Sequence, residues 1–267
     1  MIEVNAISFR YHEDWVLQDV SFRVERGEFV GVIGPNGSGK TTLLKMLYRL
    51  LGPQDGEILF ESVPLAKMDR RDIAKRIAVV AQETQLLFPF TVLETVLMGR
   101  SPYLGNLMFE SEKDLEIARK AMEWTKVLPF SERPVDELSG GERKRVFIAR
   151  ALAQEPEVIL LDEPTASLDI HHQIDFLDLI LTLNRERGLT IVMVSHDMNT
   201  ASEFCDRLIL LQKGRVYKTG SPGEVITKEN IESVYGCEVW VDRHPVSGMP
   251  RVSLMKKGDR DEALGRN

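Results

Sequence analysis

The stretch "GPNGSGKTT", residues 34–42, follows the apolar run "EFVGVI" (28–33) and leads into the leucine-rich run "TTLLKMLYRLL" (41–51). The first run predicts a strand covered on both faces of a sheet. The leucine spacing of the second predicts a helix that ends before Gly52-Pro53. A Gly-x-x-x-x-Gly-Lys-Thr pattern between a strand and a helix is the context of a phosphate-binding loop.

Each residue type in this loop suits a polyphosphate. Gly34 and Gly39 let backbone N–H groups turn inward around phosphate oxygens, and the helix N-terminus adds partial positive charge. Lys40 would bring a full charge to the β and γ phosphates, and the Thr41 hydroxyl could bind Mg²⁺. The alternative is a glycine-rich turn with a solvated lysine, but the flanking strand and helix favour the phosphate loop.

Composition narrows the class of protein. The chain has 267 residues, 43% of them hydrophobic and 28% charged, which is an ordinary globular balance with a sizeable core. A formal charge of −7 argues against non-specific nucleic-acid binding, so no nucleic-acid partner is expected. Cys205 and Cys237 are expected to be reduced thiols. No signal peptide and no membrane-spanning apolar run is expected.

Further runs predict an α/β organisation. Strands are expected at 2–11, 16–24, 56–60, 76–82, 158–162 and 190–195, with a hairpin at 207–220. Two amphipathic helices, 111–128 and 141–156, predict a helical subdomain inserted into the core. We expect a core of about 1–85 and 156–241, a helical subdomain of about 86–155, and a partly mobile extension at 242–267, where "MKKGDRDEALGRN" (255–267) carries little core signal.

The run "VILLDE" (158–163) places a pair of carboxylates at the end of a buried strand. Asp162 is suited to holding Mg²⁺ through water, and Glu163 is suited to polarising the water that attacks the γ-phosphate. The two side chains could instead cap the next helix, but Pro164 follows them, and carboxylates so close to a sheet need a charge partner. A bound cation would provide one.

The motif "LSGGE" (138–142) makes the class specific. It resembles the signature motif of ATP-binding cassette (ABC) proteins, and the other family motifs appear in the expected order. Tyr11 resembles the aromatic residue that stacks on adenine. Gln82 resembles the glutamine that links Mg²⁺ and the attacking water to the helical subdomain. Asp169 of "ASLD" resembles the residue that contacts the opposite subunit, and His196 resembles the histidine that contacts the γ-phosphate.

Each of these residues alone has an ordinary structural explanation. Tyr11 could be a half-buried strand aromatic, His196 a hydrogen-bonded core histidine, and Gln82 a solvated strand end. The resemblance, which covers about residues 1–235, requires all of these explanations to fail together. One departure is visible. Lys144 stands where the family commonly has glutamine, and we expect it on the helix surface with little effect on hydrolysis.

The resemblance implies a fold, a site and cofactors. The fold is a P-loop NTPase (RecA-like) core with an antiparallel β subdomain and an inserted helical subdomain, and the cofactors are ATP and Mg²⁺. The implied catalytic residues are Glu163, His196 and Gln82. The implied ATP-binding residues are Tyr11, Gly34, Pro35, Asn36, Gly37, Ser38, Gly39, Lys40, Thr41, Thr42, Ser139, Gly140, Gly141 and Asp169. The implied metal-binding residues are Thr41, Gln82 and Asp162.

The resemblance also implies partners. Ser139, Gly140 and Gly141 open a helix in the other subdomain, an anion site that in ABC proteins completes the pocket of a second copy. We therefore expect a homodimer or a dimer with a close paralogue, docked on an integral membrane permease at the cytoplasmic face, with a substrate-binding protein acting indirectly. Residues 84–105, with Leu87, Phe88 and Phe90, should line the docking groove. Alternatively, these side chains are subdomain core.

The cargo is indicated by a subgroup resemblance only. "TVLETVLMGRSPYLG" (91–105) and the segment 220–241 resemble ATPases of iron-siderophore, haem and cobalamin importers. Two other classes stay open: a soluble ABC ATPase of iron-sulfur cluster assembly, and a regulatory module that binds nucleotide without hydrolysing it. The presence of Glu163 and His196 disfavours the regulatory module. A DNA-maintenance ATPase is disfavoured because no long heptad stretch is present.

Overall fold

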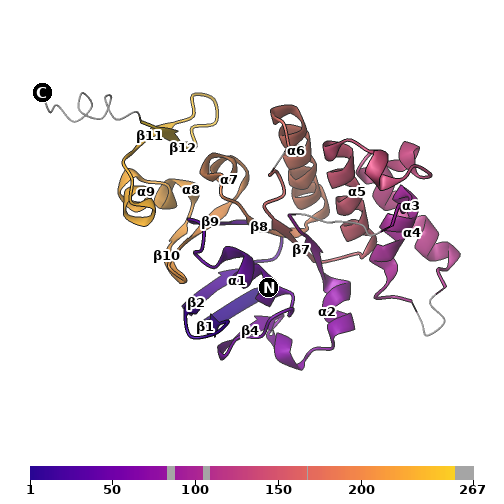
Figure 1. The fold of residues 1–267 in the computed structure, drawn as a ribbon, viewed down its shortest axis with the longest axis horizontal. Coiled ribbons are helices and arrows are strands. Elements are labelled where there is room, and N and C mark those ends of the chain that lie inside the picture. Colours follow the sequence, from indigo (N-terminus) through magenta and orange to yellow (C-terminus); the bar gives the residue numbers. More distant parts are fainter. Residues whose placement is uncertain (83–87, 105–108, 167, 256–267) are drawn as a thin grey trace, which may run out of the picture.

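A six-stranded sheet forms the centre of the computed structural model, which describes residues 1–82, 88–104, 109–166 and 168–255 (Figure 1). In spatial order its strands are β10 (Arg215–Gly220), β9 (Arg207–Gln212), β3 (Phe29–Ile33), β8 (Thr190–Val194), β7 (Val158–Asp162) and β6 (Ile77–Val80). Neighbouring strands pair in parallel, except β10, which is antiparallel to β9. The strands read as continuous apolar runs because both faces of this sheet are covered.

Alternate residues of each central strand enter two different cores. In β3, Val30 and Val32 face one core, whereas Phe29 and Ile33 face the other. Strands β7 and β8 divide their side chains in the same way. Successive side chains of a strand point to opposite faces, so burial on both sides needs apolar residues at every position.

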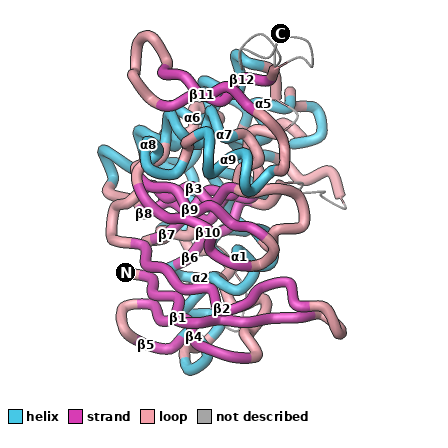
Figure 2. Tube along the Cα trace, turned by 90° about the vertical axis from the view of Figure 1, so that its left-hand side faces the viewer, coloured by secondary structure: helices cyan, strands magenta, loops and turns pink. Residues whose placement is uncertain are grey.

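The first core lies between the two sheets. A four-stranded antiparallel sheet contains, in spatial order, β2 (Trp15–Val24), β1 (Ile2–Arg10), β4 (Asp55–Phe60) and β5 (Val63–Pro64). Figure 2 shows α1 (Lys40–Leu47) and α2 (Arg70–Arg76) between this sheet and the central one. The apolar face of α1 contributes Leu43, Leu44 and Leu47 to this core.

The second core lies on the opposite face of the central sheet. It is covered by α6 (Ile170–Arg187), α7 (Met198–Phe204), α8 (Pro222–Val225) and α9 (Lys228–Tyr235), which Figure 2 shows as one layer. Helix α6 begins at Asp169, whose side chain accepts the backbone N–H of His172, and ends at Gly188 in the left-handed conformation. Such an N-cap and a C-terminal glycine are the usual helix boundaries.

The helical subdomain has a third, separate core. The subdomain contains α3 (Val92–Leu97), α4 (Glu112–Trp124) and α5 (Gly140–Ala153), with short 3₁₀ turns at Met98–Arg100, Leu128–Phe130 and Val135–Glu137. A further 3₁₀ turn, Leu65–Lys67, follows β5 in the core. Each of the subdomain's three α-helices begins with a capping box, formed by Thr91 with Glu94, Ser111 with Asp114, and Ser139 with Glu142. The subdomain lies at one end of the molecule (Figure 1).

Several elements of the structure were not predicted from the sequence. These are the short helices α2, α3 and α7–α9 and the C-terminal hairpin of β11 (Val239–Arg243) and β12 (Pro250–Leu254). The hairpin carries few buried apolar residues, and it is fixed instead by hydrogen bonds between side chains of α7 and its backbone. Both the N–H and the C=O of Val252 bond to the Asn199 side chain. The boundary predicted at residue 241 therefore falls inside a strand, and residues 256–267 lie outside the described part.

The arginine of "MGRSPYLG" (98–105), Arg100, packs inside the subdomain. Arg100 is 3% exposed and donates hydrogen bonds to Asp114 Oδ1 (2.8 Å), the Ala153 carbonyl (2.7 Å) and Glu155 Oε2 (2.8 Å). Its guanidinium lies 3.9 Å from the centre of the Tyr103 ring. One side chain thus ties the turn after α3 to the start of α4 and the end of α5.

Hydrogen bonds also hold the Asp114 carboxylate in its charged form. The Ser111 hydroxyl and backbone N–H, and then Arg100, lower the pKa of Asp114 to about 2. Because this pKa is depressed in the folded state, the resulting stabilisation is present above the ordinary carboxyl pKa of about 4 and is lost as the pH falls towards 2.

The described helices include none long and apolar enough to cross a membrane.

Substitution Arg100→Met should destabilise the helical subdomain. It leaves the Asp114 carboxylate without its buried partner, so the free energy of unfolding should fall by about 3 kcal/mol. Urea unfolding at pH 7 measures the loss. The control is Lys120→Met, which removes an exposed pair with Glu116 on α4 and should leave the midpoint unchanged. Equal midpoints for the two variants would contradict the structural role of Arg100.

Candidate active site

Four segments predicted to form the site meet at one edge of the central sheet. The phosphate loop follows β3, the carboxylate pair ends β7, His196 follows β8, and Gln82 follows β6. Neighbouring parallel strands end at the same edge, and crevices at the carboxyl ends of such strands are where α/β proteins bind ligands. The structure therefore brings together residues that are more than 150 positions apart in the chain.

The phosphate loop depends on backbone conformations that favour glycine. Gly34, Gly37 and Gly39 have φ values of 149°, 76° and 99°. A Cβ on Gly34 would overlap the Leu211 carbonyl oxygen, and one on Gly39 would lie 2.6 Å from Leu17 Cδ2. These positions cannot accept a side chain without displacing the neighbouring strands, and this fixes the curvature of the loop.

Lys40 and Ser38 show that the loop suits an anion. The Lys40 ammonium donates to the carbonyls of Gly34 (2.7 Å) and Pro35 (3.1 Å). Burial lowers the pKa of Lys40, while the nearby carboxylates of Glu163 and Asp162 act in the opposite direction. The Ser38 hydroxyl is 2% exposed and has no hydrogen-bond partner among the described residues. A phosphate oxygen at this loop would satisfy the hydroxyl and the ammonium together.

Thr41 and Asp162 offer the oxygen ligands that Mg²⁺ prefers. The Thr41 hydroxyl, at the start of α1, donates to Oδ1 of Asp162, at the end of β7, at 3.4 Å. Burial, and then the charge of Glu163, raise the pKa of Asp162. A divalent cation held between these oxygens would offset that cost, so the donor set fits the expected metal.

Three predicted catalytic residues meet around one carboxylate. The Gln82 amide donates to Glu163 Oε2 at 3.0 Å, and Nδ1 of His196 lies 3.3 Å from the same oxygen. Glu163 itself has a φ of 45°, with its N–H bonded to the Val194 carbonyl at 3.0 Å. A left-handed conformation is uncommon for a residue other than glycine, and such local strain is often found at functional sites.

Tyr11 lies beside the end of the phosphate loop, next to Thr42. Its ring is 52% exposed and packs edge-on against Phe9, with 5.0 Å between the ring centres. Its hydroxyl is 3.5 Å from Thr42 Oγ1, one residue beyond Thr41 in α1. An open aromatic face beside the loop is what stacking on a base requires, and that role stays a prediction.

The signature residues lie on the helical subdomain, away from this cluster. Ser139 caps α5, and both its N–H and its hydroxyl bond to Glu142 Oε2, at 2.9 and 2.8 Å. None of the hydrogen bonds within the described ranges joins Ser139, Gly140 or Gly141 to the phosphate loop. The two predicted anion-binding segments of one chain, the phosphate loop and the signature motif, therefore belong to the core and to the helical subdomain, respectively.

Sequence reasoning missed a contact made by Lys144. Its Nζ donates to the Gln82 carbonyl at 2.8 Å, and the side chain is half-buried instead of lying freely on the helix surface. The contact joins α5 of the helical subdomain to the residue whose amide holds Glu163. The only sequence signal was the lysine at a position where the family commonly has glutamine.

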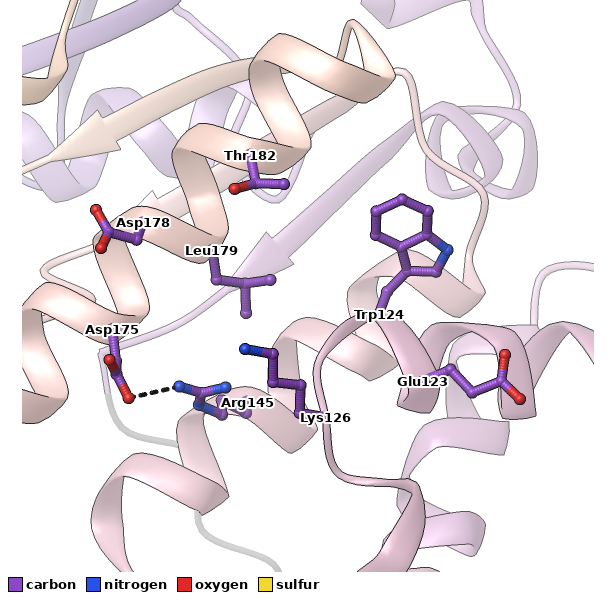
Figure 3. Close-up of a pocket in the computed structure, with 8 residues that line it drawn as sticks. All are labelled: Glu123, Trp124, Lys126, Arg145, Asp175, Asp178, Leu179 and Thr182. Atoms are coloured by element: carbon purple, nitrogen blue, oxygen red, sulfur yellow. Dashed lines mark hydrogen bonds and ion pairs between the residues drawn. The ribbon is translucent and has the colours of Figure 1, made fainter.

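A cavity at a different place has a volume of about 560 Å³ and is lined by residues of α4, α5 and α6 together with Lys126. Figure 3 shows Trp124 and Lys126 on one side of it and Asp178 and Leu179 on the other. None of the predicted site residues lines it. It marks the seam between the helical subdomain and the core and is separate from the phosphate loop.

The fold and the site together define a P-loop nucleoside triphosphatase whose core carries an inserted helical subdomain. The family model described as ABC transporter matches residues 17–166, more than half of the chain. The chain therefore belongs to the ABC transporter family, and it is an ATP-binding subunit of the kind that couples ATP hydrolysis to transport. This confirms the predicted fold class and the predicted ATPase activity.

Curated relatives cover nearly the whole chain. The petrobactin import ATP-binding protein FpuD of Bacillus anthracis is 39% identical over 259 residues, which are 97% of this chain and 95% of FpuD. The ferric enterobactin transport ATP-binding protein FepC of Escherichia coli (strain K12) is 39% identical over 246 residues, 92% and 91% of the two chains. YvrA of Bacillus subtilis (strain 168), an uncharacterized ABC transporter ATP-binding protein, is 40% identical over 97% of this chain, which spans 59% of YvrA.

Solved structures agree with this assignment. One, described as an inward-facing conformation of a metal-chelate type ABC transporter, has a TM-score of 0.85 and 28% identity, covering 96% of this chain and 98% of that one. The dimeric structure of MJ0796, a bacterial ABC transporter cassette, has a TM-score of 0.72 and 32% identity, covering 83% and 98%. Cassettes of this fold thus form dimers.

Substitution Lys144→Met should lower ATP turnover. Loss of the hydrogen bond to the Gln82 carbonyl, worth about 1 kcal/mol, should reduce kcat by about fivefold. The affinity for MgADP should not change, because Lys144 does not contact the phosphate loop. Steady-state hydrolysis and calorimetric MgADP binding separate the two quantities. Lys144→Arg keeps a donor of similar reach and should retain most of the activity; equal kcat values for all three proteins would show that the contact has no part in turnover.

Proposed function

We propose that the chain powers the uptake of a metal chelate by hydrolysing MgATP between two copies of itself, on a membrane permease at the cytoplasmic face of the membrane. The observation that carries the proposal is the Glu163 carboxylate, held by Gln82 and His196 at the edge of the sheet that carries Lys40. Such a group is suited to accept a proton from a water molecule that attacks the γ-phosphate.

The remaining predicted residues divide the task. Lys40, with the backbone of residues 34–42, binds the β and γ phosphates, and Tyr11 supports the adenine. Thr41, Gln82 and Asp162 would hold Mg²⁺, which when bound neutralises charge on the phosphate oxygens. His196 contacts the γ-phosphate and fixes the orientation of Glu163. The rate acceleration comes mainly from positioning and charge stabilisation, because phosphoryl transfer needs little covalent chemistry from the protein.

Two copies arranged head to tail would complete two such sites. Ser139, Gly140 and Gly141 open α5 of the helical subdomain, Asp169 caps α6 of the core, and we assign all four to the nucleotide of the partner copy. The dimeric cassette structure of a relative supports this arrangement. The γ-phosphate then joins the two surfaces, and its hydrolysis releases them.

Substitution Glu163→Gln should abolish turnover and trap the dimer. The amide keeps the size of the side chain but cannot accept a proton from water, so kcat should fall by about 100-fold or more. Phosphate release measures turnover, and light scattering after gel filtration measures the mass with MgATP and with MgADP. A dimer with MgATP and a monomer with MgADP are expected. A monomer at saturating MgATP would contradict the two-site arrangement.

The surface between core and helical subdomain supports a permease partner. Phe88 is 66% exposed and Phe90 is half-buried. The centres of the two rings are 6.1 Å apart. Separately, a hollow of about 320 Å³ is lined by residues of α2, the turn at Met98–Arg100 and α5. An exposed aromatic side chain and a hollow between core and subdomain would each suit short helices of a membrane partner. Leu87 and residues 84–86 lie outside the described part of the chain.

The chelate class is supported by relatives. FpuD and FepC are named for petrobactin import and ferric enterobactin transport, and the matching transporter structure is described as metal-chelate type. In the motif "MGRSPYLG", which resembles the same subgroup, Arg100 is buried and bonds to Asp114 and Ala153, so this residue does not contact the cargo.

A pull-down separates this proposal from a soluble ABC ATPase of iron-sulfur cluster assembly. The tagged Glu163→Gln chain is incubated with detergent-solubilised native membranes, with and without MgATP, and the bound proteins are identified by mass. A polytopic membrane protein in equal amount is expected. Soluble partners alone would favour cluster assembly while leaving the ATPase chemistry intact.

A further inference from the structure

A histidine lies between Asp169 and the signature motif, the two parts of the chain that are expected to face a second copy. His172 is the third residue of α6, three positions after Asp169. Its ring Nδ1 lies 2.8 Å from Asp169 Oδ1 and 2.9 Å from Oδ2, and its backbone N–H bonds to Oδ1 at 2.9 Å. A carboxylate only accepts hydrogen bonds, so Nδ1 carries the proton and fixes the orientation of Asp169.

The other edge of the same ring lies against the signature motif. A Cβ built on Gly141 would overlap Cδ2 of His172 and would lie 2.8 Å from its Cγ and 3.0 Å from Nε2. Gly141 is therefore in direct contact with the imidazole, and a side chain at this position would displace the ring. Next to it, a Cβ on Gly140 would lie 3.8 Å from Leu168 Cδ2, so the loop before Asp169 also approaches the motif.

The starts of α5 and α6 are also joined by an ion pair, one turn further along both helices. Arg145 follows Gly141 by four residues, Asp175 follows His172 by three, and their side chains meet at 2.8 Å (Figure 3). Residues three or four apart lie on the same face of a helix. The starts of α5 and α6 are thus packed together along one seam, with His172 at the end that carries Gly141 and Asp169.

We propose that His172 is a positioning residue that fixes Asp169 and the signature glycines relative to each other, so that they meet the nucleotide of a second copy as one preformed surface. The proposal rests on the two-copy arrangement proposed above. Donors aimed at a developing charge act only when they are held in place, and a displacement of about 1 Å can cost about 100-fold in rate. His172 supplies that support from within the chain, without contacting the phosphate loop of its own core.

The test compares variants that each keep a different contact of the ring. His172→Ala removes both contacts, His172→Asn keeps a donor for Asp169, and His172→Phe keeps a ring against Gly141. The matched control is His171→Ala, because the His171 side chain is 80% exposed and precedes His172 in the same helix. For each variant, kcat, the Kd for MgADP, the thermal midpoint, and MgATP-dependent dimerisation in the Glu163→Gln background are measured.

His172→Ala should lower kcat by about 10- to 100-fold and weaken the MgATP dimer, with unchanged MgADP binding and thermal midpoint. The Asn and Phe variants should each recover part of the activity, and His171→Ala should match the unsubstituted protein. Wild-type kcat and dimerisation in His172→Ala would overturn the positioning role. So would parallel losses of MgADP binding and thermal midpoint, which would show a merely structural residue.

A double-mutant cycle with Gly141→Ala tests the contact itself. The added methyl group should clash with the ring, and His172→Ala should make room for it, so the double variant should lose less than the product of the two single losses. Independent, multiplicative losses would contradict a shared contact. If the unsubstituted chain neither hydrolyses MgATP nor dimerises with it, the proposed function fails, and the role of His172 fails with it.

Discussion

The parallel pairing of β6, β7, β8 and β3 is the constraint on which the rest of the site depends. Each strand is buried on both faces and leaves the sheet at the same edge, so the residues that follow it must accommodate the backbone turn there. Gly34 and Glu163 both meet this requirement with positive φ values. The convergence of a lysine, two carboxylates, a histidine and a glutamine is a consequence of strand register.

Charge balance at this edge is set by the same geometry. Asp162, Glu163 and Lys40 lie close together in a partly buried setting, where burial raises the pKa of Asp162 and lowers that of Lys40. Each charged form is therefore costly without further partners. ATP carries anionic phosphates and a bound Mg²⁺ would add a cation, so together they would satisfy groups that the fold has already placed.

The helical subdomain contacts the core through apolar packing of α5 and through hydrogen bonds. Lys144 bonds to the Gln82 carbonyl, and the Gln82 amide bonds to Glu163, so two hydrogen bonds link α5 to this carboxylate. His172 and the Arg145–Asp175 pair join the start of α5 to α6, which follows the Asp169 cap. Within the subdomain, Arg100 joins the turn after α3 to α4 and α5.

The sequence by itself determined the class and most of the site. A buried strand, a glycine loop and a helix in immediate succession are local features, so residues 34–42, the carboxylates of "VILLDE" and the strands of the sheet could be predicted from short windows. The tertiary structure alone decided what depends on distant pairs: the Lys144–Gln82 contact, the approach of His172 to Gly141, and the docking of the C-terminal hairpin on Asn199. These contacts join segments whose individual patterns carry no periodicity, because a single hydrogen bond or one ring against a glycine leaves no repeat in the sequence.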